Sequence, residues 1–199
     1  LCDIIDIPSH WPRLCAIDFG WDHPTACVWV AWDRDVDTAY VYDSYSIRQE
    51  TVPVHSSAIN ARGKWIPVIW PQDGRQADKG SGKNLTEQYK KEGVNMCATW
   101  FTNPPQKGLR EGTGGNSVEA GIMEMLVRMQ TKRLKIFKNQ GKLLEELRMH
   151  HRKDGKIVPM NDDLISALRY CIMSLRKARL KIYEPIQQFT DSEFNVFAR

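Results

Sequence analysis

The first fifty residues alternate apolar and polar positions with a period of two, which is the pattern of half-buried strands. Residues 14–19 form a short apolar run, and residues 25–33 and 38–46 alternate and are rich in Val, Trp and Tyr. The turn-forming residues from Gly20 to Pro24 and the polar segment 34–37 separate these runs. We therefore expect three strands in an antiparallel meander.

Helices and strands alternate in the middle of the chain. Residues 52–63 and 85–92 have helical character, with a glycine at position 63 and another at position 93 to end the helices. Residues 66–70 are a continuous apolar run, which indicates a central strand covered on both faces, and residues 94–100 predict a further strand. The segment 103–115 contains two prolines and four glycines, so we expect a loop there.

The C-terminal part returns to helical periodicity. Asn116 predicts the start of a helix, because Glu119 follows three positions later as in a capping box. A strand, a helix and a small hairpin are predicted next, over residues 134–137, 141–150 and 152–158. The last helix begins at Asp162 or Asp163 and runs to about residue 179. This order of elements predicts an α/β domain with a mixed sheet of the five-stranded, ribonuclease-H/RuvC-like type and helices on both faces.

The composition is that of a globular protein. Of the 199 residues, 42% are hydrophobic and 26% are charged, and the mean hydropathy is −0.48. No apolar run approaches the roughly 20 residues of a membrane span, and the first 13 residues lack the pattern of a secretory signal. The first residue is Leu rather than Met, so we expect the chain to be cut from a longer protein. The five cysteines include no CxxC pair, which argues against a zinc site or disulfide framework and favours a reducing compartment.

Charge is distributed unevenly along the chain. Residues 128–181 contain fifteen Lys or Arg and five Asp or Glu, a formal charge of +10, whereas the whole chain carries +4. A basic C-terminal half suggests a polyanionic partner. Charged residues on solvated helix faces explain the same numbers equally well.

Three acidic positions stand out from this background. Asp18 lies inside the first predicted strand, where an unpaired carboxylate is costly to bury. Asp73 follows the apolar strand 66–70, and Asp162 and Asp163 begin the last helix. A turn role for Asp73 and a helix cap for Asp162 or Asp163 are the simpler alternatives.

In the predicted fold these acids would meet at one point. The first strand and the strand 66–70 would be neighbours, and the last helix would pack across both. Carboxylate oxygens suit hard cations such as Mg²⁺ or Mn²⁺. Two such ions about 4 Å apart would activate a water and stabilise the leaving oxygen in phosphodiester hydrolysis.

Four segments together resemble a known family. They are AIDFGWDHPTA, IPVIWPQDG, GGNSVEAGIMEM and NDDLISALRY, at residues 16–26, 66–74, 114–125 and 161–170. The sequence is similar to the C-terminal nuclease domain of the large terminase subunit of tailed bacteriophages that package DNA by the headful mechanism. The resemblance implies a two-metal-ion endonuclease for double-stranded DNA, with Asp18, Asp73 and Asp163 as catalytic metal ligands.

The identity of the third ligand stays open within this resemblance. Related nucleases often have a further Asp three residues after the second paired acid, where this chain has Ser166. We favour Asp163, and Asp162 is then a cap or an auxiliary metal ligand.

The resemblance also implies a domain organisation and partners. Residues 1–13 would be a linker from an N-terminal ATPase domain, residues 14–182 the nuclease domain and residues 183–199 a C-terminal tail. ATP would enter only through that missing domain, because the segment Gly80–Lys83 lacks the spacing of a P-loop. The expected partners are double-stranded DNA, the portal protein and the small terminase subunit, in the host cytoplasm and not at a membrane.

Basic residues near the predicted loops and hairpin are candidates for sequence-independent DNA contacts. They are Lys83, Lys107, Arg110, Arg128, Lys132, Arg133, His151, Arg152 and Lys153. For His23, in the first turn, we favour a turn role over the positioning of a water. Two other functions remain open, namely a non-catalytic module that docks on DNA or the portal, and another nuclease of this fold such as a junction resolvase.

Overall fold

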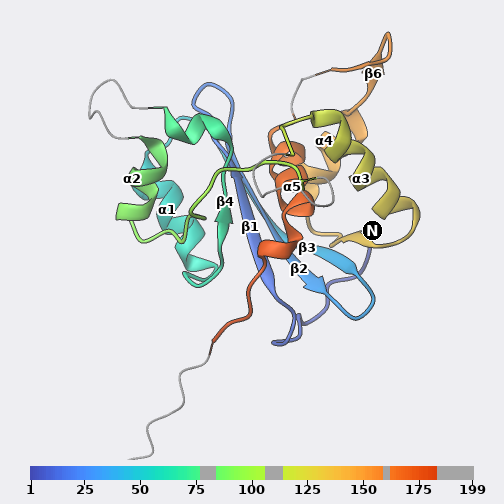
Figure 1. The fold of residues 1–199 in the computed structure, drawn as a ribbon, viewed down its shortest axis with the longest axis horizontal. Coiled ribbons are helices and arrows are strands. Elements are labelled where there is room, and N and C mark those ends of the chain that lie inside the picture. Colours follow the sequence, from blue (N-terminus) through green and yellow to red (C-terminus); the bar gives the residue numbers. More distant parts are fainter. Residues whose placement is uncertain (77–83, 106–113, 159–161, 183–199) are drawn as a thin grey trace, which may run out of the picture.

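The computed structural model describes residues 1–76, 84–105, 114–158 and 162–182, and its centre is a five-stranded mixed sheet (Figure 1). The predicted meander forms antiparallel strands at its middle. These are β1 (Arg13–Asp18), β2 (Thr25–Asp33) and β3 (Thr38–Ile47). Strand β4 (Val68–Ile69) pairs parallel to β1, and β5 (Leu134–Ile136) pairs parallel to β3. The order β4-β1-β2-β3-β5 confirms the predicted fold class.

Helices cover both faces of this sheet, as Figure 1 shows. Alternate residues of β1 divide between the two sides: Cys15 and Ile17 pack in one apolar cluster, and Leu14 and Ala16 in the other. The first cluster includes residues of α1 (Val52–Ala61) and α2 (Leu85–Lys91). The second includes residues of α3 (Val118–Gln130), α4 (Gly141–Met149) and α5 (Asp163–Met173).

Helix α5 lies directly on β1 and β2 and is the most buried helix. Its buried face contains Leu164, Leu168, Cys171 and Ile172, which all lie in the core. The helix is shorter than predicted and ends at Met173. A 3₁₀ turn η2 (Leu175–Lys177) follows.

Beyond that turn the backbone returns to the sheet. The N–H of Arg13 donates to the carbonyl of Arg179 over 2.8 Å, and the N–H of Arg179 donates back to Arg13 over 3.0 Å. Extended pairing at residue 179 is incompatible with a helix there, which is why the predicted helix was too long.

The strand predicted over 94–100 was wrong. Met96 makes one isolated bridge to Val68, and Val94 and Met96 are buried. The regular pairing stops at Cys97. The Cys97 carbonyl accepts a hydrogen bond from the indole N–H of Trp70 over 2.7 Å, and the Trp70 carbonyl accepts from the N–H of Phe101 over 2.7 Å. The segment therefore contributes side chains to the core without forming a strand.

Two further details concern the C-terminal half. The capping box at Asn116 was wrong, because Ser117 is the N-cap of α3, and its hydroxyl accepts from Ala120 N–H over 3.4 Å. The Glu119 carboxylate pairs with Arg152 instead. The predicted hairpin is confirmed as β6 (Arg152–Lys153) and β7 (Lys156–Ile157).

The first residues, predicted as a linker, pack on this sheet. The backbone of Cys2 pairs with the chain beside β5, and the Trp11 ring stacks on Tyr40 with centroids 4.9 Å apart. The domain boundaries stay a prediction. Within the described ranges, no helix has the length and apolar content needed to cross a membrane.

Candidate metal and nuclease site

Three elements bring the predicted acids to one edge of the sheet. Asp18 is the last residue of β1, and Asp73 lies in the 3₁₀ turn η1 (Gln72–Arg75) that follows β4 and Pro71. Because β1 and β4 are parallel neighbours, their carboxyl ends share this edge. Asp163 is the first residue of α5, which packs across β1.

Electrostatics link the three carboxylates. Burial, followed by the negative charges of Asp73 and Asp163, raises the pKa of Asp18 from 3.8 to about 7. Desolvation also raises the pKa of Asp73, although the Gly74 N–H partly offsets it by hydrogen bonding. A nearby positive charge would therefore stabilise the ionised form of these carboxylates, as expected of residues that bind a cation.

Close packing fixes the turn that carries Asp73. A side chain at the next residue, Gly74, would place its Cβ 2.7 Å from a Phe19 ring carbon and 2.7 Å from the Thr86 hydroxyl. Such distances are too short for any real Cβ contact, so only glycine fits. The Thr86 hydroxyl also donates to the Gly74 carbonyl over 2.9 Å. The Asp-Gly pair is thus a turn, as the simpler alternative proposed, and the turn holds its carboxylate at the sheet edge.

Two neighbouring side chains contact these carboxylates. The Tyr170 hydroxyl donates to Asp18 Oδ1 over 3.3 Å, and His23 Nδ1 lies 2.9 Å from Asp163 Oδ1. Burial raises the pKa of Asp163, while the His23 contact lowers it. His23 belongs to the turn between β1 and β2, so the predicted turn position is correct, and the contact with Asp163 was missed.

The paired acids at the start of α5 have different surroundings. Asp162 occupies the N-cap position, but its side chain makes no capping hydrogen bond. Asp163 is the member of the pair whose charge raises the pKa of Asp18. This favours Asp163 over Asp162 as the third ligand.

The donor set fits a hard divalent cation. It consists of carboxylate oxygens that repel one another, and Mg²⁺ and Mn²⁺ prefer such donors. Within the described ranges, no three acidic, His or Cys side chains are already arranged around a single ion position. In the arrangement present, Tyr170 and His23 hold two of the three carboxylates.

A buried arginine lies next to this edge and was missed by the sequence reasoning. Arg169 is only 5% exposed, and its guanidinium stands over the rings of Phe101 and Tyr170, 5.3 and 4.6 Å from their centroids. Its positive charge lowers the pKa of Asp18. Among the described residues its Nη1 has no hydrogen-bond partner.

The predicted DNA-binding residues fall into three groups. Arg128 and Arg133 pair with Asp37 in the β2–β3 turn, at the opposite end of the sheet from Asp18, and Lys132 lies beside them. The structure therefore does not bring these three to the acidic edge. By contrast, the exposed hairpin β6–β7 contains Arg152 and Lys153, and the exposed His151 directly precedes it. Lys83, Lys107 and Arg110 lie outside the described residues.

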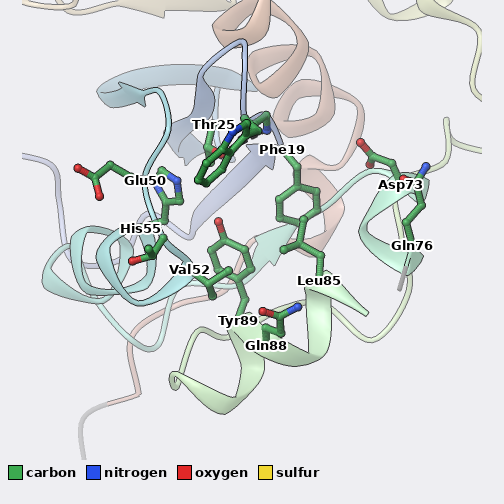
Figure 2. A pocket seen from close by; sticks show the side chains of 13 residues that line it. Phe19, Thr25, Glu50, Val52, His55, Asp73, Gln76, Leu85, Gln88 and Tyr89 are labelled. Atoms are coloured by element: carbon green, nitrogen blue, oxygen red, sulfur yellow. Dashed lines mark hydrogen bonds between the residues drawn. The ribbon is translucent and has the colours of Figure 1, made fainter. Parts of the chain in front are cut away.

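A cavity of about 470 Å³ opens beside Asp73 on the α1 and α2 side of the sheet (Figure 2). Phe19, Leu85 and Tyr89 form its apolar part, with Asp73 at one end and His55 toward the other. The His55 ring nitrogen Nδ1 lies 2.9 Å from the hydroxyl of the half-buried Tyr45, so the buried imidazole has a hydrogen-bond partner within the protein. The cavity is a mixed apolar and polar pocket next to the acidic edge.

Comparison with known proteins identifies the family. Residues 15–175 match the family described as the terminase RNaseH-like domain. The large terminase subunit of Salmonella phage P22 is 38% identical over 180 residues, which cover 90% of this chain and 34% of that protein. The chain thus spans about a third of the length of that relative.

Solved structures agree with this assignment. The large terminase nuclease domain of P22 has a TM-score of 0.79 at 38% identity, covering 90% of this chain and 89% of that chain. More distant nuclease domains share the fold. That of phage G20c with bound cobalt has a TM-score of 0.55 at 17% identity over 85% and 84% of the two chains. The nuclease domain of phage SPP1 with bound manganese has a TM-score of 0.54 at 9% identity, covering 80% of this chain and 82% of that chain. The chain belongs to the terminase RNaseH-like domain family.

Proposed function

We propose that this chain is the metal-dependent endonuclease domain of a viral DNA-packaging terminase. It would cleave concatemeric double-stranded DNA to initiate and to terminate packaging of a genome into the procapsid. The observation that carries the proposal is the set of Asp18, Asp73 and Asp163 at one sheet edge, where burial, followed by the negative charges of Asp73 and Asp163, raises the pKa of Asp18. The likeness to the P22 nuclease domain supports it.

In this proposal the catalytic residues Asp18, Asp73 and Asp163 hold two Mg²⁺ or Mn²⁺ ions, with Asp162 as an auxiliary ligand. Bound divalent ions supply a lowered water pKa and neutralise the charge that develops on the phosphate. The Tyr170 hydroxyl orients the Asp18 carboxylate, and His23 does the same for Asp163. The cobalt and manganese bound by the G20c and SPP1 nuclease domains support the use of divalent metals.

The DNA backbone would lie across the acidic edge and the β6–β7 hairpin. His151, Arg152 and Lys153 are exposed there and would contact phosphates without reading sequence. Arg152 would first have to exchange its ion pair with Glu119 for a phosphate. Lys83, Lys107 and Arg110, which lie outside the described residues, are proposed as further DNA contacts. Lys132 would contact DNA only at the far end of the sheet, and the ion pairs with Asp37 leave Arg128 and Arg133 less available.

The whole protein would be larger than this chain. The P22 relative is about three times as long, and we propose an ATPase domain that precedes this chain and is joined to it through residues 1–13. ATP would act only through that domain. The portal protein and the small terminase subunit are the proposed partners, and the host cytoplasm is the proposed place of action.

Nicking of supercoiled plasmid tests the function. We expect cleavage with Mn²⁺ or Mg²⁺, no cleavage with EDTA, and loss of at least a hundredfold in rate for Asp18→Asn. Asp6→Asn is the matched control, because Asp6 is exposed near the start of the chain. Unchanged nicking by Asp18→Asn would exclude this site. A strong preference for four-way junctions over linear duplex would instead assign a junction resolvase.

A further inference from the structure

The first turn of α5 is capped by a side chain from another helix. Glu146 lies in α4, and its Oε2 accepts hydrogen bonds from the backbone N–H groups of Leu164 over 2.9 Å and of Ile165 over 3.2 Å. With Asp162 at the N-cap, these are the second and third residues of the helix. An N-cap side chain ordinarily accepts from those same donors. Glu146 therefore performs the capping for α5 from outside the helix.

This arrangement leaves the two local acids free of that task. Asp162 has the residue type and the position of a capping residue, yet its side chain makes no capping bond. Asp163 directs its Oδ1 to His23. A carboxylate also complements the partial positive charge of a helix N-terminus, so Glu146 satisfies the orphan donors and the helix dipole together.

The Glu146 contacts also fix the position of the turn that carries Asp163. Leu164 is fully buried and Ile165 is 2% exposed, both in the core beneath α5. Their N–H groups are attached to α4 through Glu146, so the backbone immediately after Asp163 is held from the core side and from α4.

We propose that Glu146 is a positioning residue that holds the first turn of α5 so that Asp163 can share cations with Asp18 and Asp73. This inference rests on the proposed function, because it assigns a role in the same cation site. Glu146 acts through the α5 backbone and is not itself a ligand. Loss of supporting contacts of this kind typically weakens metal binding by roughly 10- to 100-fold.

Three substitutions separate this role from its alternatives. In Glu146→Gln the side-chain amide oxygen can still accept from both N–H groups, whereas in Glu146→Ala no acceptor remains. Asn84→Ala is the matched control for a lost cap, because Asn84 Oδ1 accepts from Glu87 N–H at the start of α2, on the opposite face of the sheet. Glu145→Gln controls for charge, since Glu145 is the exposed neighbour on α4.

Mn²⁺ binding by titration calorimetry is the primary measurement, with thermal unfolding in EDTA and the amide proton shifts of residues 164 and 165 alongside. We expect Mn²⁺ affinity to fall at least tenfold in Glu146→Ala and less than threefold in Glu146→Gln, Glu145→Gln and Asn84→Ala. The amide proton shifts should move strongly only in Glu146→Ala.

Each other outcome overturns the inference in a distinguishable way. Unchanged affinity in Glu146→Ala would make the contact purely structural. Equal losses in Glu146→Gln and Glu146→Ala would make Glu146 a charged ligand rather than a positioning residue. A tenfold loss in Asn84→Ala would show that general destabilisation explains the effect. If the unsubstituted chain binds no Mn²⁺, the proposed function itself fails.

Discussion

Replacing Asp18 by Asn should stabilise the metal-free protein at neutral and alkaline pH. The folded state raises the pKa of Asp18 from 3.8 to about 7, because burial and the charges of Asp73 and Asp163 disfavour its ionised form. At about 1.4 kcal/mol per pH unit, this change corresponds to an upper limit of about 4 kcal/mol. Water around a partly exposed group screens part of it, so we expect about 1–3 kcal/mol.

The pH dependence follows from the direction of that change. Between pH 4 and pH 7 the folded state binds the Asp18 proton and the unfolded state does not, so this group makes stability fall as pH rises. Above pH 7 both states are ionised and the full cost remains. The stability gain of Asp18→Asn should therefore be small near pH 4, grow through pH 7 and level off above it.

Urea unfolding in EDTA at pH 5, 7 and 8.5 measures this gain, with Asp6→Asn as the exposed control. Added Mn²⁺ should then reverse the order, because an ion that binds only the folded wild type stabilises it by mass action. A variant that is less stable than wild type at pH 8.5 in EDTA would refute the reasoning. So would a gain that is the same at every pH.

Packing and surface charge give two further predictions. In Gly121→Ala the new Cβ would lie 2.4 Å from Arg169 Cγ, so urea unfolding should show a loss of about 1–3 kcal/mol. Gly141→Ala, where no atom lies within 4 Å, should lose nothing. In Lys153→Met the salt dependence of DNA binding should become shallower by about one unit of slope. Arg128→Met should instead lower the stability of the fold and leave that slope unchanged, because the Arg128 guanidinium is engaged in ion pairs at the far end of the sheet. A shallower salt dependence with unchanged stability in Arg128→Met would assign Arg128 to the DNA-binding surface.

Local patterns predicted most of the sheet, because alternation and continuous apolar runs report burial residue by residue. They failed at residues 94–100, where Val94 and Met96 are buried but the segment does not pair as a strand. There the indole N–H of Trp70 donates a hydrogen bond to the Cys97 carbonyl, and a local sequence pattern cannot reveal a contact between residues 27 positions apart. The length of α5 failed for a similar reason, since residue 179 pairs with Arg13, which is 166 positions earlier.

Asp18 stood out in the sequence because a carboxylate inside an apolar strand is unusual, whereas Asp73 and Asp163 were marked by following a strand and by starting a helix. Their supporting residues were not identified. Tyr170 is seven residues after Asp163 and therefore on the same side of α5, which was an available signal. No signal in the sequence pointed to Glu146, because a helix cap that comes from a different helix depends on how α4 and α5 pack against each other.

The backbone pairing between Arg13 and Arg179 has a mechanical consequence. Two backbone hydrogen bonds join the segment that leads into the core to the segment that leaves it. They lie at the end of β1 that is remote from Asp18. A force that separates Arg13 from Arg179 would act on these two hydrogen bonds before it reached the first turn of α5. The sheet edge that carries Asp18 would therefore stay unstrained until this backbone pairing opened.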